Sequence, residues 1–519
     1  MARARAASCP PLLAAAAALA LAACGEGRKR PPPPDPPDPL ASPVRASGAS
    51  PYPGGCNPPV GGARLYLGAE VEPHLAVHPS DDLRLAAAWQ QDRWTAGGAN
   101  GIGAAASTDG GHTWIAASPP LTGCSGGDAD SHDRATDPWL SFAADGTLHL
   151  VSLVFDDPWK TARQAVVASR STDGGLTWST PVALATETST DAALDKCTLT
   201  ADPVRAGHVY AVWDRLTGLS GPAAQVAGPT WLARSTDGGA TWEAARAIHD
   251  PGANAQTISG QIAVLPGGTL VCLIVVITSL DAPRSPASLV VIRSDDAGVT
   301  WSAPIAVADL QAAGTVDPAT GQAVRDGAIV PQMAVDRASG ALHVVWQDAR
   351  WSGGARDAIA LSSSADGGLT WTAPARVSQA TAFTPSVAVA ASGRLGLSYY
   401  DLRTASPAPG LWTVRWLATS ADGGATWEEA PVGGPFDLRR APEAGGYFVG
   451  DYQGLVGLAD GFVPLFAMSG AATDVFAMPA AAAAMAPART GEAPPPAALP
   501  GPSLAARARM RLEARYRGW

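Results

Sequence analysis

Four segments of this sequence place an aspartate next to an arginine, or two residues before one, directly after an apolar run. The arginines are Arg93, Arg215, Arg350 and Arg403. A guanidinium group forms two parallel hydrogen bonds with a carboxylate or a sulfate, so several arginines that meet at one point would bind an anion. The same Asp/Arg pairs would also serve as salt bridges between neighbouring parts of the fold. The sequence leaves both interpretations open.

A second group of candidate residues is the acidic segment GGDADSHDRATDP. It holds Asp128, Asp130, His132, Asp133 and Asp137. Oxygen ligands at this density could bind Ca²⁺, although their spacing does not fit an EF-hand loop, and a solvated acidic loop is the alternative. No CxxC or HExxH pattern indicates a zinc site. We therefore expect no cofactor, with calcium as the one metal that the segment leaves open.

A repeated octet shows which elements must position these side chains. The pattern S-x-D-x-G-x-T-W recurs at intervals of roughly 60 residues, a spacing typical of repeat folds. It predicts a hairpin turn in which the aspartate accepts backbone N–H bonds, a glycine has positive φ and the tryptophan packs under the next strand. Because equivalent sites around a ring cannot all face one pocket, we expect a structural role for these aspartates. They are Asp109, Asp173, Asp237, Asp296, Asp366 and Asp422.

The segments ahead of the octets form a second repeat, in which two apolar strands flank a Gly- or Asp-containing turn. A seventh copy begins at Gly450 and has a third strand, Thr473 to Met478, but no octet. The pattern predicts an all-β protein, a seven-bladed β-propeller of four-stranded antiparallel blades, with six blades as the alternative. The strand from Ala63 to Gly68 is expected to complete the last blade and so to remove an open sheet edge.

The octet resembles the Asp-box, or BNR repeat, of the sialidase superfamily, and the resemblance spans roughly residues 70 to 478. It implies a pocket at the propeller mouth in which three arginines hold a substrate carboxylate. It also implies a tyrosine nucleophile assisted by a glutamate, with an aspartate as acid/base. A neutral tyrosine suits an anionic sugar, because a carboxylate nucleophile would repel such a substrate.

Carried over residue by residue, this resemblance is incomplete. Glu72-Pro73-His74 stands where the family has its first arginine motif, and Arg440-Ala441-Pro442 matches that motif only in a later blade. Asp92 and Arg93 correspond to the acid and the second arginine. The tyrosine and glutamate candidates are Tyr452, or Tyr447, and Glu443, in and near GGYFVGDYQGL. A packed strand that closes the ring explains the same segment.

The N-terminal segment has the pattern of an export signal. Arg3 and Arg5 precede an apolar run that is too short to span a bilayer. Leu21-Ala22-Ala23-Cys24 resembles a bacterial lipobox, which implies a lipid on Cys24, a membrane-anchored lipoprotein and a periplasmic or cell-surface location. The expected domains are a signal peptide (1–23), a proline-rich tether (24–60), the propeller (61–479) and an Ala/Pro-rich, basic tail (480–519).

Composition limits the partners and the cysteine chemistry. A formal net charge of −10 without a basic stripe argues against nucleic acid. An exported protein permits disulfides, and Cys124 with Cys197 is the preferred pair because both lie on connections between successive blades, whereas Cys272 should be a buried thiol. Two functions remain: a surface sialidase-like glycoside hydrolase acting on anionic glycans, or a non-catalytic propeller that binds glycans or proteins, its protein partners undefined.

Overall fold

The computed structural model of the protein describes residues 42–59, 61–128, 130–157, 161–282, 285–403 and 410–479. All of them belong to the compact unit that begins at Ser42. They form β-strands joined by loops, and no α-helix occurs among them. The all-β prediction is therefore confirmed. The loops include four short 3-10 turns: η1 (Gly123–Ser125), η2 (Ala223–Gln225), η3 (Arg350–Ser352) and η4 (Leu438–Arg440).

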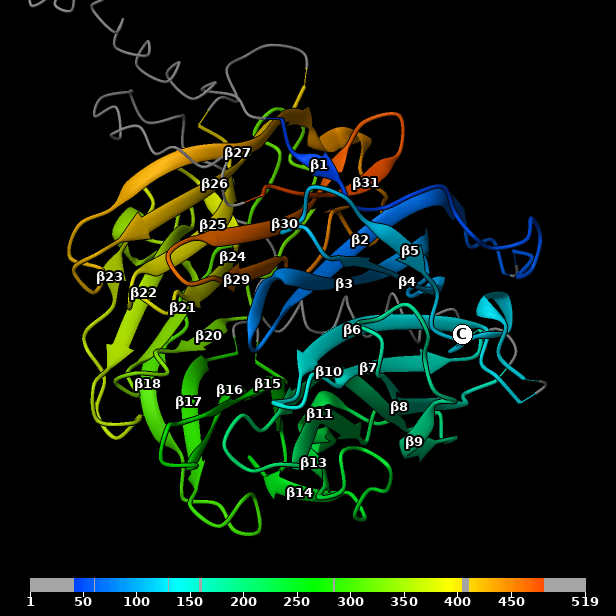
Figure 1. Cartoon of the computed structure of the whole chain (residues 1–519), viewed down its shortest axis with the longest axis horizontal. Coiled ribbons are helices and arrows are strands. Elements are labelled where there is room, and N and C mark those ends of the chain that lie inside the picture. Colours follow the sequence, from blue (N-terminus) through cyan, green and yellow to red (C-terminus); the bar gives the residue numbers. More distant parts are fainter. Residues whose placement is uncertain are drawn as a thin grey trace, which may run out of the picture. The chain divides into compact units, whose positions relative to one another are not determined.

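The strands pair into antiparallel groups of four, and the groups follow one another around a ring in chain order (Figure 1). The first three groups are β2 (Leu65–His78), β3 (Asp81–Trp94), β4 (Ala99–Ser107) and β5 (Ile115–Ala117); β6 (Arg134–Phe142), β7 (Leu148–Phe155), β8 (Gln164–Ser171) and β9 (Val182–Glu187); and β10 (Ala192–Ala201), β11 (Val209–Thr217), β13 (Thr230–Ser235) and β14 (Arg246–His249).

The next three groups repeat this pattern. They are β15 (Ala255–Val264), β16 (Leu270–Thr278), β17 (Ala287–Ser294) and β18 (Ile305–Asp309); β20 (Gln332–Val335), β21 (Leu342–Asp348), β22 (Ala358–Ser364) and β23 (Ala375–Arg376); and β24 (Ala382–Val389), β25 (Leu395–Asp401), β26 (Trp412–Ser420) and β27 (Glu428–Asp437). Three short strands lie outside the groups: β12 (Ala227–Gly228), β19 (Val324–Arg325) and β28 (Tyr447–Phe448).

The last group joins the two ends of the described chain. It consists of β29 (Gly454–Gly457), β30 (Phe462–Ser469), β31 (Thr473–Ala477) and β1 (Val44–Arg45). Val44 pairs with Ala477, and β1 lies beside β31 in Figure 1. The expectation that Ala63 to Gly68 closes the ring was wrong, because Leu65 and Tyr66 extend β2 and pair with β3. An N-terminal strand does cover the open edge, but it comes from the segment assigned to the tether.

First strands of neighbouring groups lie side by side around the axis of the ring. The Thr198 hydroxyl of β10 donates to the Gly260 carbonyl of β15 at 2.7 Å. The Ser386 hydroxyl of β24 likewise donates to the Gln453 carbonyl, just before β29, at 2.7 Å. Sheets arranged in this way around an axis form a β-propeller. The first strands are thus the elements that can bring side chains together at its centre.

The octets form the turns between the third and fourth strands. In the turn at Asp237, the carboxylate accepts the Thr241 backbone N–H at 2.9 Å and its hydroxyl at 2.6 Å. These hydrogen bonds lower the pKa of Asp237 to about 2. Gly239 has a φ of +74°, which a side chain would disfavour. In five of the octets the tryptophan indole donates to a glycine carbonyl of its own turn.

The disulfide prediction was wrong in its pairing. Cys56 bonds with Cys124 in η1, which ties the segment after β1 to the connection between the first two groups. Cys197 lies in β10 near the axis, where its thiol donates to the Asp137 carbonyl at 3.4 Å. Because that position is buried, Cys197 remains a free thiol, as does the buried Cys272.

Candidate functional site

The first strands carry a recurrent backbone irregularity near the axis. Pairing of the first strand with the second shifts register at this point in five groups. In each, a residue other than glycine adopts a left-handed backbone, with φ between 45° and 65°. Such bulges re-aim side chains and cost conformational energy, so they concentrate at functional or closely packed sites. The five residues are Glu72, Asp137, Lys196, Ser259 and Thr384.

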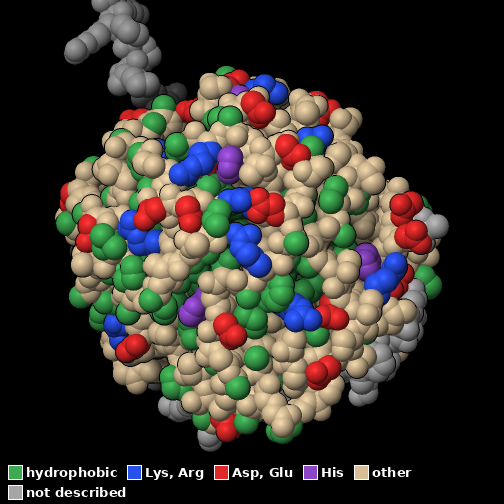
Figure 2. Space-filling view, turned by 90° about the horizontal axis from the view of Figure 1, so that it is seen from below, with side chains coloured by type: hydrophobic (Ala, Val, Ile, Leu, Met, Phe, Trp, Pro, Cys, Tyr) green, Lys and Arg blue, Asp and Glu red, His purple; other side chains and the backbone are tan. Residues whose placement is uncertain are grey.

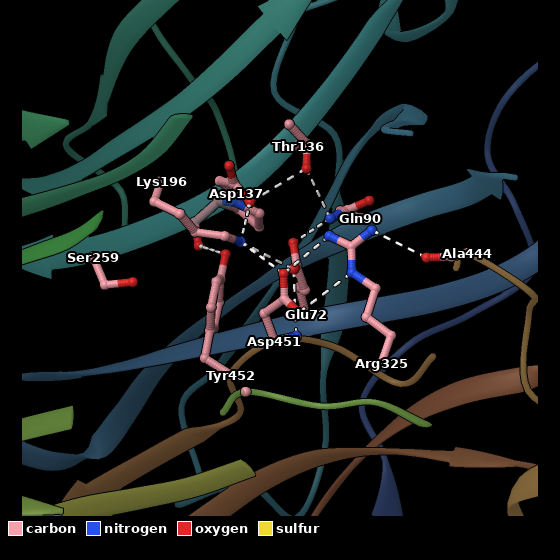
Figure 3. Close-up of polar contacts among 12 residues, drawn as sticks. Glu72, Gln90, Thr136, Asp137, Lys196, Ser259, Arg325, Ala444, Asp451 and Tyr452 are labelled. Atoms are coloured by element: carbon pink, nitrogen blue, oxygen red, sulfur yellow. Dashed lines mark hydrogen bonds and ion pairs between the residues drawn. The ribbon is translucent and has the colours of Figure 1, made fainter. Parts of the chain in front are cut away.

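Three carboxylates converge on the Lys196 ammonium group (Figure 3). Its Nζ lies 2.8 Å from Asp137 Oδ1, 3.0 Å from Asp451 Oδ2 and 3.3 Å from Glu72 Oε1. Asp451 occupies the equivalent place just before β29. All four side chains are buried, at 4% exposure or less. We call Glu72, Asp137, Lys196 and Asp451 the axial cluster.

A second cation reaches the axial cluster from a loop. Arg325 of β19 donates to Asp451 Oδ2 at 3.0 Å and to the Ala444 carbonyl at 3.3 Å (Figure 3). Residues of β28 and the turn after it also lie directly on the cluster, because the Glu72 N–H donates to the Val449 carbonyl and the Asp451 N–H donates to Glu72 Oε1. Gly450 has a φ of +131° and lies against the Glu72 backbone, so a Cβ there would be only 2.7 Å from the Glu72 nitrogen.

Two loop segments thus cover the axial cluster on this side. They are residues 311–331, which contain β19, and residues 438–450, which contain β28. β19 and β28 pair in parallel, Val324 with Tyr447. Arg439 forms an ion pair with Asp317 at 2.7 Å, and Gln322 donates to Glu443 at 3.1 Å. We call these two segments the cover.

Burial decides the charge state of the cluster. It raises the pKa of Glu72 to about 7; Lys196 opposes this rise, while Asp137 and Asp451 add to it. Near neutral pH, Glu72 is therefore held close to half protonation. With Glu72 protonated, two carboxylates face two cations, Lys196 and Arg325, and the formal charges of these five groups balance.

Tyr452 follows the cluster directly in the chain and lies on the axis. Its ring packs edge-on against Trp139 at 5.4 Å, and Lys196 Nζ lies 5.5 Å from its centre. Its hydroxyl donates to the Pro138 carbonyl at 2.9 Å. Burial and then the carboxylates of Glu72 and Asp137 raise the pKa of Tyr452 well above its usual value. The phenol is therefore protonated, and its proton points to a backbone carbonyl.

Lys196, Trp139 and Tyr452 also line a cavity next to the cluster. Its volume is about 10 Å³, and its remaining lining comes from Cys197, Thr198, Ser259, Gln261, Val330, Pro331 and Gln332. A volume of about this size holds roughly one water molecule. A sugar ring does not fit into the cavity in this conformation.

The other catalytic candidates, Glu443 and Asp92, do not bind Tyr452. Glu443 accepts hydrogen bonds from the Gly446 N–H at 2.6 Å and from Gln322. Asp92 accepts the Ser50 hydroxyl at 2.7 Å and the Gly68 N–H at 2.8 Å. No hydrogen bond joins either carboxylate to the Tyr452 hydroxyl. Of the three catalytic candidates from the sequence, the structure places Tyr452 at the axis.

The four candidate arginines each bind partners within the chain. Arg93 is buried and donates to Gln90 Oε1 at 2.8 Å. Arg215 forms an ion pair with Glu187 of the preceding group at 2.8 Å. Arg350 binds Asp348 at 2.8 Å and the Asp309 carbonyl, and Arg403 binds Asp401 and Glu429. Their role in substrate binding stays a prediction, because each would have to exchange such a partner for a ligand.

The acidic segment does not form one site. Asp137 belongs to the axial cluster, Asp133 accepts the Asp157 N–H at 2.9 Å, and His132 pairs with Asp156 at 3.0 Å. Asp128 accepts the Asp130 N–H within its own turn. Within the described residues, no group of three or more His, Cys, Asp or Glu side chains is arranged to hold a metal ion.

Sequence reasoning missed Glu72, Lys196 and Asp451 as members of one site. The signal was present in the aligned first strands, where Glu72-Pro73, Asp137-Pro138 and Thr384-Pro385 occupy equivalent positions. A proline there needs no ladder hydrogen bond, which suits a bulge. The residue before each proline is the one that adopts the left-handed backbone.

No family model matches the sequence, and no curated protein matches it. Among solved structures, the Hadza microbial sialidase Hz136 is similar, with a TM-score of 0.46, 18% identity and 75% of each chain covered. The Penicillium chrysogenum α-L-arabinanase gives a TM-score of 0.45, 15% identity, and 84% of this chain and 98% of that chain covered. The NanB sialidase of Streptococcus pneumoniae gives 0.44, 10%, 79% and 93%. In the part of the chain that the structure describes, no helix has the length and apolar character to cross a membrane.

Proposed function

We propose that this protein is an exported, lipid-anchored, seven-bladed β-propeller that hydrolyses glycosides at the axial cluster. The observation that carries the proposal is the convergence of Glu72, Asp137 and Asp451, from three separate groups of strands, on Lys196. Hydrolysis of a glycosidic bond by carboxylates needs one protonated and one ionised group at the same site. The pKa of about 7 for Glu72, beside an Asp137 paired with an ammonium group, supports this division.

Glu72 is the proposed general acid. It gives its proton to the glycosidic oxygen as the bond from that oxygen to the anomeric carbon breaks. Asp137 is the proposed base, which takes a proton from the water that attacks the anomeric carbon. We assign this role to Asp137 rather than Asp451, because Asp451 binds both Lys196 and Arg325. Tyr452 packs against the cluster, and a nucleophilic role for it would require its proton to move from the Pro138 carbonyl to a carboxylate.

The charge balance favours a neutral sugar over an anionic one. Lys196 and Arg325 already face carboxylates, and the arginines at the strand ends already bind partners within the chain. On the face shown in Figure 2, acidic and basic side chains are mixed and form no patch of one sign. An anionic substrate would therefore have to displace an existing ion pair, which costs its desolvation and its lost partner.

Substrate entry requires the cover to move, because the cavity beside Lys196 has room for about one water molecule. The contacts that hold the cover in place lie on its outer side. The Arg439 side chain is 27% exposed, so its ion pair with Asp317 faces water. Loop movements that admit a substrate and then exclude water are common in enzymes of this kind of buried site.

The test is hydrolysis of a panel of fluorogenic glycosides between pH 4 and pH 8, including arabinofuranosides, sialosides and uronides. Glu72→Gln removes the acid and should lower kcat by about 100-fold or more. Glu70→Gln is the matched control, because Glu70 is a buried carboxyl on the same strand that faces Val475 instead of the cluster. Its kcat should stay within about threefold of the parent. If the parent protein hydrolyses nothing, catalysis is rejected.

A non-catalytic glycan- or protein-binding propeller is the second candidate. The small cavity favours it, since a buried, charge-balanced cluster also serves as a fastener between groups of strands. A glycan array probed with the same purified protein separates the two functions. Binding without turnover, unchanged in Glu72→Gln, would support this second candidate.

A further inference from the structure

The Glu72 and Asp137 carboxylates are linked by one side-chain amide, that of Gln90. Its nitrogen donates to Glu72 Oε2 and to the Thr136 hydroxyl, the latter at 2.9 Å (Figure 3). The Thr136 hydroxyl in turn donates to Asp137 Oδ1 at 3.4 Å. Gln90 is 1% exposed, so no bulk water competes for its amide.

The orientation of this amide is decided by Arg93. Arg93 Nη1 donates to Gln90 Oε1 at 2.8 Å. A guanidinium group has no acceptor atom, so only the amide oxygen can face it. The amide nitrogen is then forced toward Glu72 and Thr136. The chain of hydrogen bonds therefore has one direction, from Arg93 through Gln90 to both carboxylates.

The position of Arg93 is itself set by packing. Its side chain is 1% exposed and donates to the Gly98 carbonyl at 3.1 Å. The guanidinium group lies over the Phe448 ring, 4.9 Å from its centre. Arg325, which binds Asp451, also lies over that ring, at 4.4 Å. Phe448 in the cover thus contacts the two arginines that lead to different carboxylates of the axial cluster.

We propose that Arg93 is a positioning residue, which acts through Gln90 to keep hydrogen-bond donors pointed at Glu72 and Asp137. This role rests on the proposed hydrolysis for its catalytic consequence, but the hydrogen-bond chain does not. It replaces the substrate contact expected for Arg93 by an action on the acid and the base. The groups around Glu72 are Lys196, Asp137, Asp451, Arg325 and Tyr452, and none of them fixes the Gln90 amide by accepting from it and donating to it at once.

Loss of Arg93 would free the amide to rotate. Gln90 Oε1 would then face Glu72, where only a protonated carboxyl can donate to it. The pKa of Glu72 should consequently rise further above its value of about 7. Because the folded protein holds this proton more tightly than the unfolded chain, Glu72 makes the unfolding free energy fall as pH rises from about 4.5 to about 7. A higher pKa extends that fall to higher pH.

The experiment measures unfolding free energy by urea denaturation from pH 4 to pH 9. The proteins are the parent, Arg93→Met, Glu72→Gln and the double variant. We expect Arg93→Met to move the upper end of the fall upward by about one pH unit, the size expected for loss of a hydrogen bond to a charged group. In the Glu72→Gln background, the same substitution should cause no such movement. Arg93→Lys keeps the charge but loses the planar fork, and should give a smaller movement in the same direction.

Arg134→Met is the matched control. Arg134 is also fully buried and lies over an aromatic ring, that of Trp94, but it binds Asp157 away from the cluster. It should lower stability without moving the profile of Glu72. An unchanged profile in both Arg93 variants, or an equal movement in Arg134→Met, would overturn the proposal. If Arg93→Met does not fold, Arg93→Lys decides the question.

The kinetic readout separates this proposal from the proposed function. In a parent protein that hydrolyses a glycoside, Arg93→Met should move the alkaline limb of the kcat profile by the same amount and change KM little. A parent protein without activity would reject hydrolysis while the stability profiles still test the hydrogen-bond chain. An active parent whose two profiles do not move in Arg93→Met would reject the positioning role alone.

Discussion

Lys196 has the most demanding environment of any residue in this protein. Removing an ammonium group from water costs several kcal/mol, and this cost is offset only by close and well-oriented partners. Glu72, Asp137 and Asp451 supply those partners within 3.3 Å. The residues come from the first strands of separate groups, so each contact also joins parts of the ring that are distant in sequence.

Replacement of Lys196 by Met should therefore lower the unfolding free energy by about 3–5 kcal/mol at pH 8, because buried carboxylates lose their counter-ion. The loss should shrink at pH 5, where the carboxylates of the variant take up protons. Urea denaturation at both pH values measures the effect. Arg163→Met is the control: that side chain is 40% exposed and pairs with Asp156, so its loss should cost less than about 1 kcal/mol. Equal losses in the two variants would show that the axial cluster is not a special contact.

At the scale of elements, the first strands combine two tasks. Their regular parts pair with the second strands, while the bulge turns one side chain per strand toward the axis. The last group needs an additional element, because β31 would otherwise present an unpaired edge. β1 covers that edge, and Arg45 forms an ion pair with Asp474 at 2.5 Å while the Val475 N–H donates to the Ser47 hydroxyl at 3.0 Å.

Removal of β1 should open the ring at this edge. A protein that starts at residue 42 should be as stable as the longer mature chain, whereas one that starts at residue 50 should lose about 2 kcal/mol of unfolding free energy. The estimate combines the few hydrogen bonds of β1 with the burial of Ala46. The shorter protein should also aggregate faster, because an unpaired strand edge recruits other strands. Identical denaturation curves would exclude β1 as the closing strand.

At the scale of the whole molecule, the proposed anchor decides where the propeller acts. A lipid on Cys24 would leave a proline-rich segment of about 20 residues before β1, and such segments are semi-extended spacers. The propeller would then work close to a membrane surface without inserting into it.

A Cys24→Ala variant tests the anchor. It should lose metabolically incorporated palmitate and move from the membrane fraction to the soluble fraction when the protein is expressed in a bacterial host. The propeller itself should be unaffected, so the purified variant should show the same melting temperature as the purified parent domain. A variant that stays in the membrane fraction as firmly as the parent would contradict the lipobox interpretation.

The sequence by itself determined the repeat architecture of the protein. Each octet specifies its turn through contacts within eight residues, such as the Asp237–Thr241 hydrogen bonds and the positive φ of Gly239. The strand pairs ahead of the octets are equally local, since alternating apolar residues and turn residues specify a hairpin. Tyr452 was also singled out by its polar neighbours at the start of a strand.

Only the tertiary structure decided the composition of the axial site, the closing strand and the disulfide. Glu72 and Asp451 are far apart in sequence, and their meeting depends on closure of the ring, which no local pattern encodes. The left-handed backbone of Glu72, Asp137 and Lys196 is imposed by pairing with the second strands, so residue type alone does not reveal it. Cys56 reaches Cys124 because β1 places the N-terminal segment against the first group, a long-range contact that the spacing of cysteines cannot show.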